Sequence, residues 1–150
     1  MTKEDYMRLA LKLAKRAAKK DEVPVAAIIT NPATGEVVAK AANKSAHSGD
    51  ATSHAEILAI RRACKKIQEN RLWGLDMYVT LEPCTMCAAA ISFARIKNLY
   101  FGATDEKGGA VLSGIKFYEA KTCHHKPNVE GGILSAECSA ILKDFFKNKR

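Results

Sequence analysis

No apolar run in this sequence approaches the roughly 18–20 residues that a membrane-spanning helix needs. The polar opening from Met1 to Asp5 has no apolar segment behind it, so it makes a poor secretory signal. No repeat, low-complexity segment or linker interrupts the 150 residues, and the composition, 47% hydrophobic and 27% charged, is that of an ordinary globular chain. These absences predict one domain over residues 1–150, in the cytoplasm and without a membrane partner.

Acidic residues are in deficit. Lys and Arg number 24 against 16 Asp and Glu, which leaves a net charge of +8. A surplus of this size raises the local concentration of polyanions and speeds their encounter. Nucleic acid is therefore the leading candidate partner, although the basic residues between Lys12 and Lys20 also suit a simple solvated helix face.

Disulfide bonds are not indicated, because the five cysteines are odd in number and nothing suggests export. In a reducing compartment such thiols are free, metal-bound or catalytic. Cys64, Cys123 and Cys138 are scattered, and we expect them to be ordinary buried small residues. Cys84 and Cys87 form a C-x-x-C motif with chemistry of its own.

Hydrophobic periodicity and turn residues predict alternating strands and helices. Helices are expected over residues 6–17 and 53–69, from near residue 83, and over 135–149. Strands are expected over 23–29 and 36–39, which form a hairpin, and over 76–81 and 97–102. Residues 43–52 are typical of a loop, and 115–131 fit no element. The alternation predicts a layered α/β domain with helices on both faces of a sheet.

Two short motifs stand at predicted helix starts, His54-Ala55-Glu56 and Pro83-Cys84-Thr85-Met86-Cys87. Each has a simpler explanation when taken alone. Ser53 to Glu56 matches a helix capping box, in which Ser53 caps the helix and Glu56 bonds back to it. A C-x-x-C can be a redox pair or half of a structural zinc site.

Together the motifs supply one imidazole and two thiolates, and this set predicts a catalytic zinc site. Structural zinc sites normally close with four protein ligands, whereas catalytic sites keep one position for water. Neither Cys123 nor any other histidine has the spacing of a fourth ligand. We therefore expect one Zn²⁺ ion on His54, Cys84 and Cys87, with a zinc-bound water as the nucleophile.

Helix starts suit these residues, because the free amides and partial positive charge of a helix N-terminus lower the pKa of a thiol. Pro83 is expected at the helix start, where its missing amide costs nothing. Glu56 follows His54 by two residues, and such positions do not share a helix face. Glu56 is therefore expected beside the nucleophile as the catalytic proton shuttle, not as a ligand.

The combination of H-x-E with P-C-x-x-C is the signature of zinc nucleobase deaminases. The sequence resembles the cytidine-deaminase-like superfamily and, more narrowly, the bacterial tRNA-specific adenosine deaminases, along nearly the whole chain. The stretches that carry the resemblance are Val23-Pro24-Val25, His54 to Ile57, Tyr78 to Cys84, Met86-Cys87, Ala94-Arg95-Ile96, Gly102-Ala103 with Asp105 and Lys107, and Phe145-Phe146. The resemblance implies a three-layer α/β/α fold with a central mixed sheet. It also implies conversion of adenosine to inosine at the wobble position of a tRNA anticodon.

Substrate contacts follow from the same resemblance. Asn43 should hydrogen-bond the target nucleoside, and Asp105 and Lys107 should lie near the RNA. The family's usual Asn-His pair reads His124-His125 here, so His124 stands where the family places an asparagine that helps to hold substrate. The family's usual glycine after Val-Pro-Val is Ala26.

The C-terminal helix offers further contacts to an anticodon stem-loop. Phe145 is the candidate aromatic partner for a splayed base, unless Phe145 and Phe146 both pack inward. The basic residues near the C-terminus, which suit phosphates, are Lys143, Lys147, Lys149 and Arg150.

The helix after Cys87 is apolar on almost every side. One of its faces is expected to pack against a second subunit, as in the homodimers of the family, or else within the same domain.

Three other functions compete with this interpretation. A deaminase of free guanine or cytosine would share His54, Glu56 and both cysteines and differ in its loops. A non-catalytic, zinc-stabilised RNA-binding module would bind the metal without turnover. A redox C-x-x-C protein would leave His54 and Glu56 unexplained. The net charge of +8 favours RNA over a small neutral base.

Overall fold

A five-stranded sheet in the order β2-β1-β3-β4-β5 forms the centre of the computed structural model, which describes residues 1–149. The strands are β1 (Ala26–Thr30), β2 (Val37–Ala42), β3 (Asp76–Leu81), β4 (Asn98–Ala103) and β5 (Asn128–Glu130). β1 pairs antiparallel with β2 and with β3, whereas β3, β4 and β5 run parallel. The sheet is therefore mixed, as the resemblance implied.

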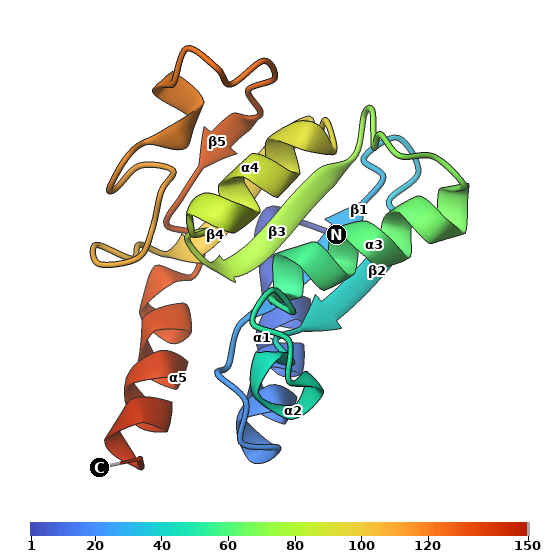
Figure 1. Ribbon diagram of the computed structural model, residues 1–150. Coiled ribbons are helices and arrows are strands. Elements are labelled where there is room, and N and C mark those ends of the chain that lie inside the picture. The colour runs from blue at the N-terminus through green and yellow to red at the C-terminus, as the bar shows by residue number, and fades with distance from the viewer. Residues whose placement is uncertain (150) are drawn as a thin grey trace.

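Two pairs of helices cover the two faces of the sheet (Figure 1). Helices α1 (Lys3–Lys19) and α5 (Ser135–Lys147) pack on one face, and α3 (Ala55–Ile67) and α4 (Thr85–Phe93) lie side by side on the other. Alternate residues of β1 serve the two sides: Ile28 packs with the α1 cluster, while Ala27 and Ile29 pack with α3 and α4. The three-layer α/β/α fold is confirmed.

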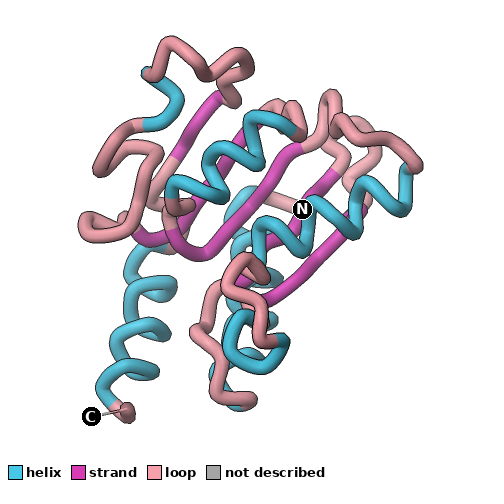
Figure 2. The backbone as a smooth tube through the Cα atoms, viewed as in Figure 1, coloured by secondary structure: helices cyan, strands magenta, loops and turns pink. Residues whose placement is uncertain are grey.

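The strand hairpin and the four long helices agree with the sequence pattern, and β3 has the predicted bounds. Residues 43–52 contain a short helix, α2 (Ser45–Ser48), where a loop was expected. The unassigned segment 115–131 supplies a 3₁₀ turn, η1 (Phe117–Glu119), and the edge strand β5. Figure 2 shows that long loops surround these short elements. Arg150, expected to extend the basic C-terminus, lies outside the described residues.

Both helix starts at the motifs differ from the prediction. His54, not Ser53, is the N-cap of α3, and no side chain caps this helix, so the alternative explanation of the motif as a capping box is wrong. The N-cap of α4 is Cys84, which places Pro83 one residue before the cap and not in the first turn. Within residues 1–149, no helix is long and apolar enough to cross a bilayer.

Candidate functional site

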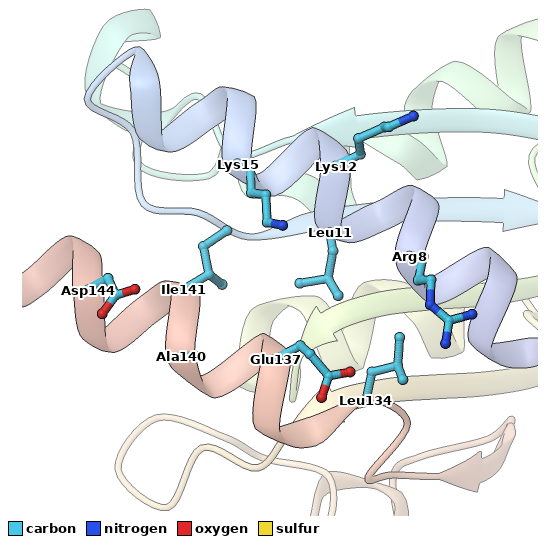
Figure 3. Close-up of a pocket in the computed structure, with 9 residues that line it drawn as sticks. All are labelled: Arg8, Leu11, Lys12, Lys15, Leu134, Glu137, Ala140, Ile141 and Asp144. Carbon is cyan, nitrogen blue, oxygen red and sulfur yellow. The ribbon is translucent and has the colours of Figure 1, made fainter.

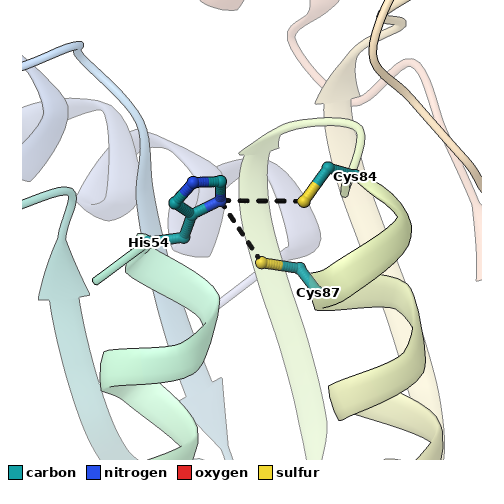
Figure 4. Close-up of side chains that lie close together, drawn as sticks. All are labelled: His54, Cys84 and Cys87. Carbon is teal, nitrogen blue, oxygen red and sulfur yellow. Dashed lines mark hydrogen bonds between the residues drawn. The ribbon is translucent and has the colours of Figure 1, made fainter. Parts of the chain in front are cut away.

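The two motifs meet where α3 and α4 begin, beside the end of β3 (Figure 4). His54 Nδ1 lies 3.7 Å from Cys84 Sγ and 3.6 Å from Cys87 Sγ. A tetrahedral zinc ion, with bonds of about 2.0 Å to nitrogen and 2.3 Å to sulfur, would separate these atoms by about 3.6 Å. The spacing of the side chains therefore fits a zinc ion bound between them.

The cluster that could hold a metal consists of His54, Cys84 and Cys87, as far as residues 1–149 are concerned. The alternative of a closed, four-ligand structural site therefore finds no fourth ligand in this part of the chain. Three protein ligands leave one position of a tetrahedral ion for water.

The two thiols of the cluster differ in pKa. The thiolate of Cys84 accepts a hydrogen bond from the thiol of Cys87, which lowers the pKa of Cys84 to about 5. The same bond raises the pKa of Cys87 above its ordinary value. Cys84 is also the N-cap of α4, where the free amides favour a negative charge. Cys84 is thus the thiol of the pair that is already prepared, as a thiolate, to bind a cation.

Glu56 lies in the first turn of α3, buried with 4% of its surface exposed. Burial raises its pKa to about 7. With His54 and Cys84 it lines a pocket of about 210 Å³ that opens beside the cluster. A carboxyl group with this pKa can both accept and release a proton near neutral pH, as a proton shuttle requires.

The residues predicted to bind substrate are only partly brought together. Asn43 and Asp105, which are far apart along the chain, both line the pocket of Glu56. The Asp105 carboxylate also accepts hydrogen bonds from the amides of Lys107 and Gly108. Asp105 therefore stabilises the turn over residues 105–108 in addition to lining the pocket. Lys107 is exposed on this loop and does not line the pocket.

His124 lies elsewhere. Its neighbour His125 contacts Ile96, and the carbonyl of His125 accepts a hydrogen bond from Ser92 near the end of α4. Cys84 of the cluster caps the start of α4, eight residues before Ser92 and therefore about 12 Å away along the helix. His124 is exposed and is not among the pocket residues, so the structure does not support the expectation that it holds a base there.

The two phenylalanines of α5 point in different directions. Phe145 is half-buried beside the end of α1, with Lys149 Nζ 5.5 Å from the centre of its ring. Phe146 is 49% exposed. The alternative in which both rings pack inward is therefore wrong. Phe146 is the more exposed ring, and Phe145, which lines a surface pocket, stays the predicted contact to a base.

A larger hollow lies between α1 and α5, on the other face of the sheet (Figure 3). Arg8, Lys12 and Lys15 line one side of this groove, and Glu137 and Asp144 line the other. It contains none of the motif residues, so the smaller pocket beside Glu56 is the candidate active site.

The sequence analysis missed a second buried carboxylate beside the site, that of Glu82. This side chain is 2% exposed and accepts hydrogen bonds from the amides of Asp105, Val111, Leu112 and Ser113. The hydroxyl of Ser113 donates a further bond at 2.9 Å. The only signal in the sequence was the position of Glu82 inside the motif stretch, directly before Pro83.

A third buried carboxylate, that of Glu22, was missed as well. It is 4% exposed and contacts Asn43, Ala46 and His47 at the other wall of the pocket. Nothing in the local sequence distinguishes Glu22 from a solvated acidic residue after a helix.

The mixed sheet covered on both faces, with the His-Cys-Cys cluster at two helix starts, defines a deaminase of the cytidine-deaminase-like class. Guanine deaminase from Nitrosomonas europaea shares this fold with a TM-score of 0.83, at 22% identity over 95% of this chain and 83% of that one.

Comparisons with known proteins narrow the class. A family model described as MafB19-like deaminase matches residues 1–150, and the chain belongs to this family. The tRNA-specific adenosine deaminase of Agrobacterium fabrum is 52% identical over 97% of this chain and 94% of its own length. A solved structure from studies of A-to-I editing by tRNA deaminases at the wobble position has a TM-score of 0.89, at 51% identity over 92% of this chain and 99% of that one. The resemblance to the bacterial tRNA-specific adenosine deaminases is therefore confirmed.

Proposed function

We propose that this protein hydrolyses adenosine to inosine and ammonia at the wobble position of a tRNA anticodon. The observation that carries the proposal is the convergence of His54, Cys84 and Cys87 beside the buried carboxyl of Glu56. The identity of 52% to a tRNA-specific adenosine deaminase supports adenosine in tRNA as the substrate. We assign residues 1–150 to one catalytic domain that acts in the cytoplasm.

His54, Cys84 and Cys87 are the residues proposed to hold one Zn²⁺ ion. Imidazole nitrogen and thiolate sulfur are ligands that zinc prefers, and the spacing of 3.6–3.7 Å between them suits its radius. When bound, zinc lowers the pKa of water to roughly 7 and so makes hydroxide available at neutral pH.

Glu56 is the proposed general base and acid. It accepts a proton from the attacking water and delivers it to the ring nitrogen. It then accepts the proton of the hydroxyl group that has added to the carbon and delivers it to the amino group, which leaves as ammonia. The pKa of about 7 supports both steps, because neither protonation state is strongly preferred near neutral pH. His54 and Glu56 are only two residues apart, but their side chains leave the start of α3 in different directions. One can therefore bind the metal while the other transfers protons.

The pocket suits one base better than a whole nucleotide. Its volume of about 210 Å³ lies below the ~300–1,000 Å³ of a typical ligand pocket. A base must leave its stack to enter such a space, and an anticodon loop presents unstacked bases. Asn43 and Asp105, which line the pocket, are the proposed contacts to the nucleoside.

A basic groove adjoins this pocket and is proposed to receive the RNA backbone. The groove has a volume of about 700 Å³ and shares Asn43 with the active-site pocket. Its basic side chains come from the end of α1, from β2, from the N-cap of α2 and from α3: Arg16, Lys20, Lys40, Lys44 and Arg62. Phosphates are the natural partners of such a groove. Lys107, Phe145 and the exposed Phe146 are further proposed contacts outside the pocket. His124 lies away from the pocket, and its placement does not support a contact to the base.

We also propose a homodimer, formed through the exposed side of α4. Met86, Ala89, Ala90 and Phe93 are all at least partly exposed, and their spacing places them on one helix face. Phe93 is 73% exposed, an unusual position for a large apolar ring. Light scattering should report a dimer for the native protein and a monomer for Phe93→Glu; a native monomer would refute the dimer alone.

The function is tested with zinc-loaded protein and an arginine-tRNA anticodon stem-loop that carries adenosine at the wobble position. Guanine, cytosine and cytidine are assayed in parallel. We expect inosine in the stem-loop and no turnover of the free substrates. Turnover of a free base alone would identify a free-base deaminase, and tight RNA binding without turnover would identify a zinc-stabilised binding module.

A further inference from the structure

Glu22 lies between the end of α1 and the wall of the active-site pocket, and its buried carboxylate collects four contacts from one short segment. Its oxygens accept hydrogen bonds from Asn43 Nδ2 at 3.3 Å, from the Ala46 amide at 3.2 Å and from the His47 amide at 2.8 Å. The imidazole Nδ1 of His47 lies 2.6 Å away. All four groups belong to residues 43–47, which the pocket shares through Asn43 and Ser45.

These contacts replace the N-terminal side-chain cap that the short helix α2 lacks. Its N-cap residue, Lys44, makes no side-chain capping bond. The amides of Ala46 and His47 in the first turn donate instead to Glu22, which is more than twenty residues earlier in the chain. Glu22 is therefore an external cap, and without it the first turn of α2 has no acceptor for these amides.

The same carboxylate fixes the orientation of the Asn43 amide. An ionised carboxylate can only accept hydrogen bonds, so the group of Asn43 that faces Glu22 has to be its NH₂. The NH₂ group also donates to Ser45 Oγ at 3.3 Å. Both contacts occupy the nitrogen, which leaves the carbonyl oxygen of Asn43 as the free acceptor at the pocket.

From this arrangement we propose that Glu22 is a positioning residue for substrate recognition. It holds the Asn43 amide with its oxygen available to a hydrogen-bond donor of the target nucleoside, and it pins the α2 turn that carries this wall of the pocket. The inference rests on the proposed function, since it assumes that a nucleoside occupies the pocket. Glu22 acts on the nucleoside through Asn43, since Glu22 itself does not line the active-site pocket.

A double-mutant cycle in the zinc-loaded protein tests this role. Glu22→Ala and Asn43→Ala should each lower kcat/KM on the stem-loop roughly tenfold, as expected for one lost hydrogen bond to substrate, and mainly through KM. If Glu22 acts through Asn43, the double variant should lose less than twofold beyond Asn43→Ala. Losses that multiply would show an independent, merely structural effect and overturn the proposal.

A second readout does not depend on activity. Hydrogen exchange at the amides of Ala46 and His47 should accelerate in Glu22→Ala, while exchange in the interior of α3 stays unchanged. Unchanged protection of both amides would overturn the proposed contact. Failure of the native protein to form inosine would count against the proposed function, and the exchange experiment would still decide whether Glu22 holds the segment.

Three control variants complete the design. Glu22→Gln keeps the volume of the side chain and one acceptor oxygen, so it should rescue part of the loss and replaces Glu22→Ala if that variant does not fold. His47→Ala removes only one of the four contacts and should have the smallest effect. Glu69→Ala makes the same change of charge at an exposed site, and it should leave KM and exchange unchanged. A tenfold rise of KM in Glu69→Ala would attribute the effect to net charge and overturn the proposal.

Discussion

Two glutamates, Glu56 and Glu82, flank the same pocket at almost the same depth, 4% and 2% exposed, yet they differ in proton affinity. Burial raises the pKa of Glu56 to about 7. Burial also acts on Glu82, but the amides of Asp105, Leu112 and Ser113 outweigh it and lower its pKa below the ordinary value. Accessible surface alone therefore does not set the charge of a buried carboxyl group; desolvation by the surrounding protein raises the pKa, and the donors around the group lower it.

The difference in pKa gives the two glutamates of this pocket different roles. Glu56 has few donors and can exchange protons, as the proposed reaction needs. Glu82 is an anion at neutral pH, and the loop from Asp105 to Ser113 donates hydrogen bonds to it. Gly109 lies so close that a Cβ atom there would come within 2.5 Å of the Glu82 carboxyl carbon. Glu56 thus suits the proposed proton transfer, whereas Glu82 holds the loop that lines the pocket.

Substituting glutamine for Glu56 or for Glu82 tests whether the two carboxyl groups have different roles. The largest expected effect is that of Glu56→Gln on catalysis. Glu56→Gln should lower kcat by about 10²–10⁴-fold, because the amide cannot carry a proton between water and base. Bound zinc, measured by mass spectrometry, should stay at one ion per chain. Loss of zinc together with activity would make Glu56 a ligand or a structural group and would remove the contrast with Glu82.

Glu82→Gln should act on stability. The substitution removes the negative charge from a cluster of five donors, and breaking such a buried network costs about 2–4 kcal/mol. Urea unfolding at pH 7 measures this loss, with Glu56→Gln as the matched control that should change stability far less. Equal losses in the two variants would show that depth, and not the donors, decides the role.

The pattern of the chain predicted the layers, the hairpin and the residues of the metal cluster, because these follow from periodicity and from spacing within short segments. It could not predict β5, whose three residues, Asn128–Glu130, pair with a single neighbouring strand and carry little apolar pattern. Nor could it predict the role of Glu82, since its donors lie 23–31 residues further along the chain. The orientation of the two phenylalanines likewise depends on how α5 packs against α1, which no local pattern contains.

The dependence of stability on pH should distinguish Glu82 further. Since its pKa in the folded protein is below the ordinary 4.5, its ionisation stabilises the fold fully above that pH. The advantage of the native protein over Glu82→Gln should therefore be constant near neutral pH and shrink as the pH falls below about 4.5. Unfolding free energies of both proteins between pH 7 and pH 3.5 measure this. An advantage that grows on acidification would contradict the assigned direction of the pKa.

Removing a single donor gives the smallest effect and tests the cause most directly. Ser113→Ala deletes the hydroxyl that donates to Glu82 Oε1 at 2.9 Å, but it keeps all four backbone donors, the Ser113 amide among them. A hydrogen bond to a charged group contributes about 1.5–3 kcal/mol, and the remaining donors should limit the loss to about 1–2 kcal/mol. Because one donor fewer holds the charge, the pKa of Glu82 in the folded protein should move upward toward the ordinary value, so the variant should lose less stability than the native protein between pH 7 and pH 3.5. If Ser113→Ala lowers the stability at pH 7 but loses as much on acidification as the native protein, packing around the hydroxyl, and not its bond to the carboxylate, is what stabilises the loop.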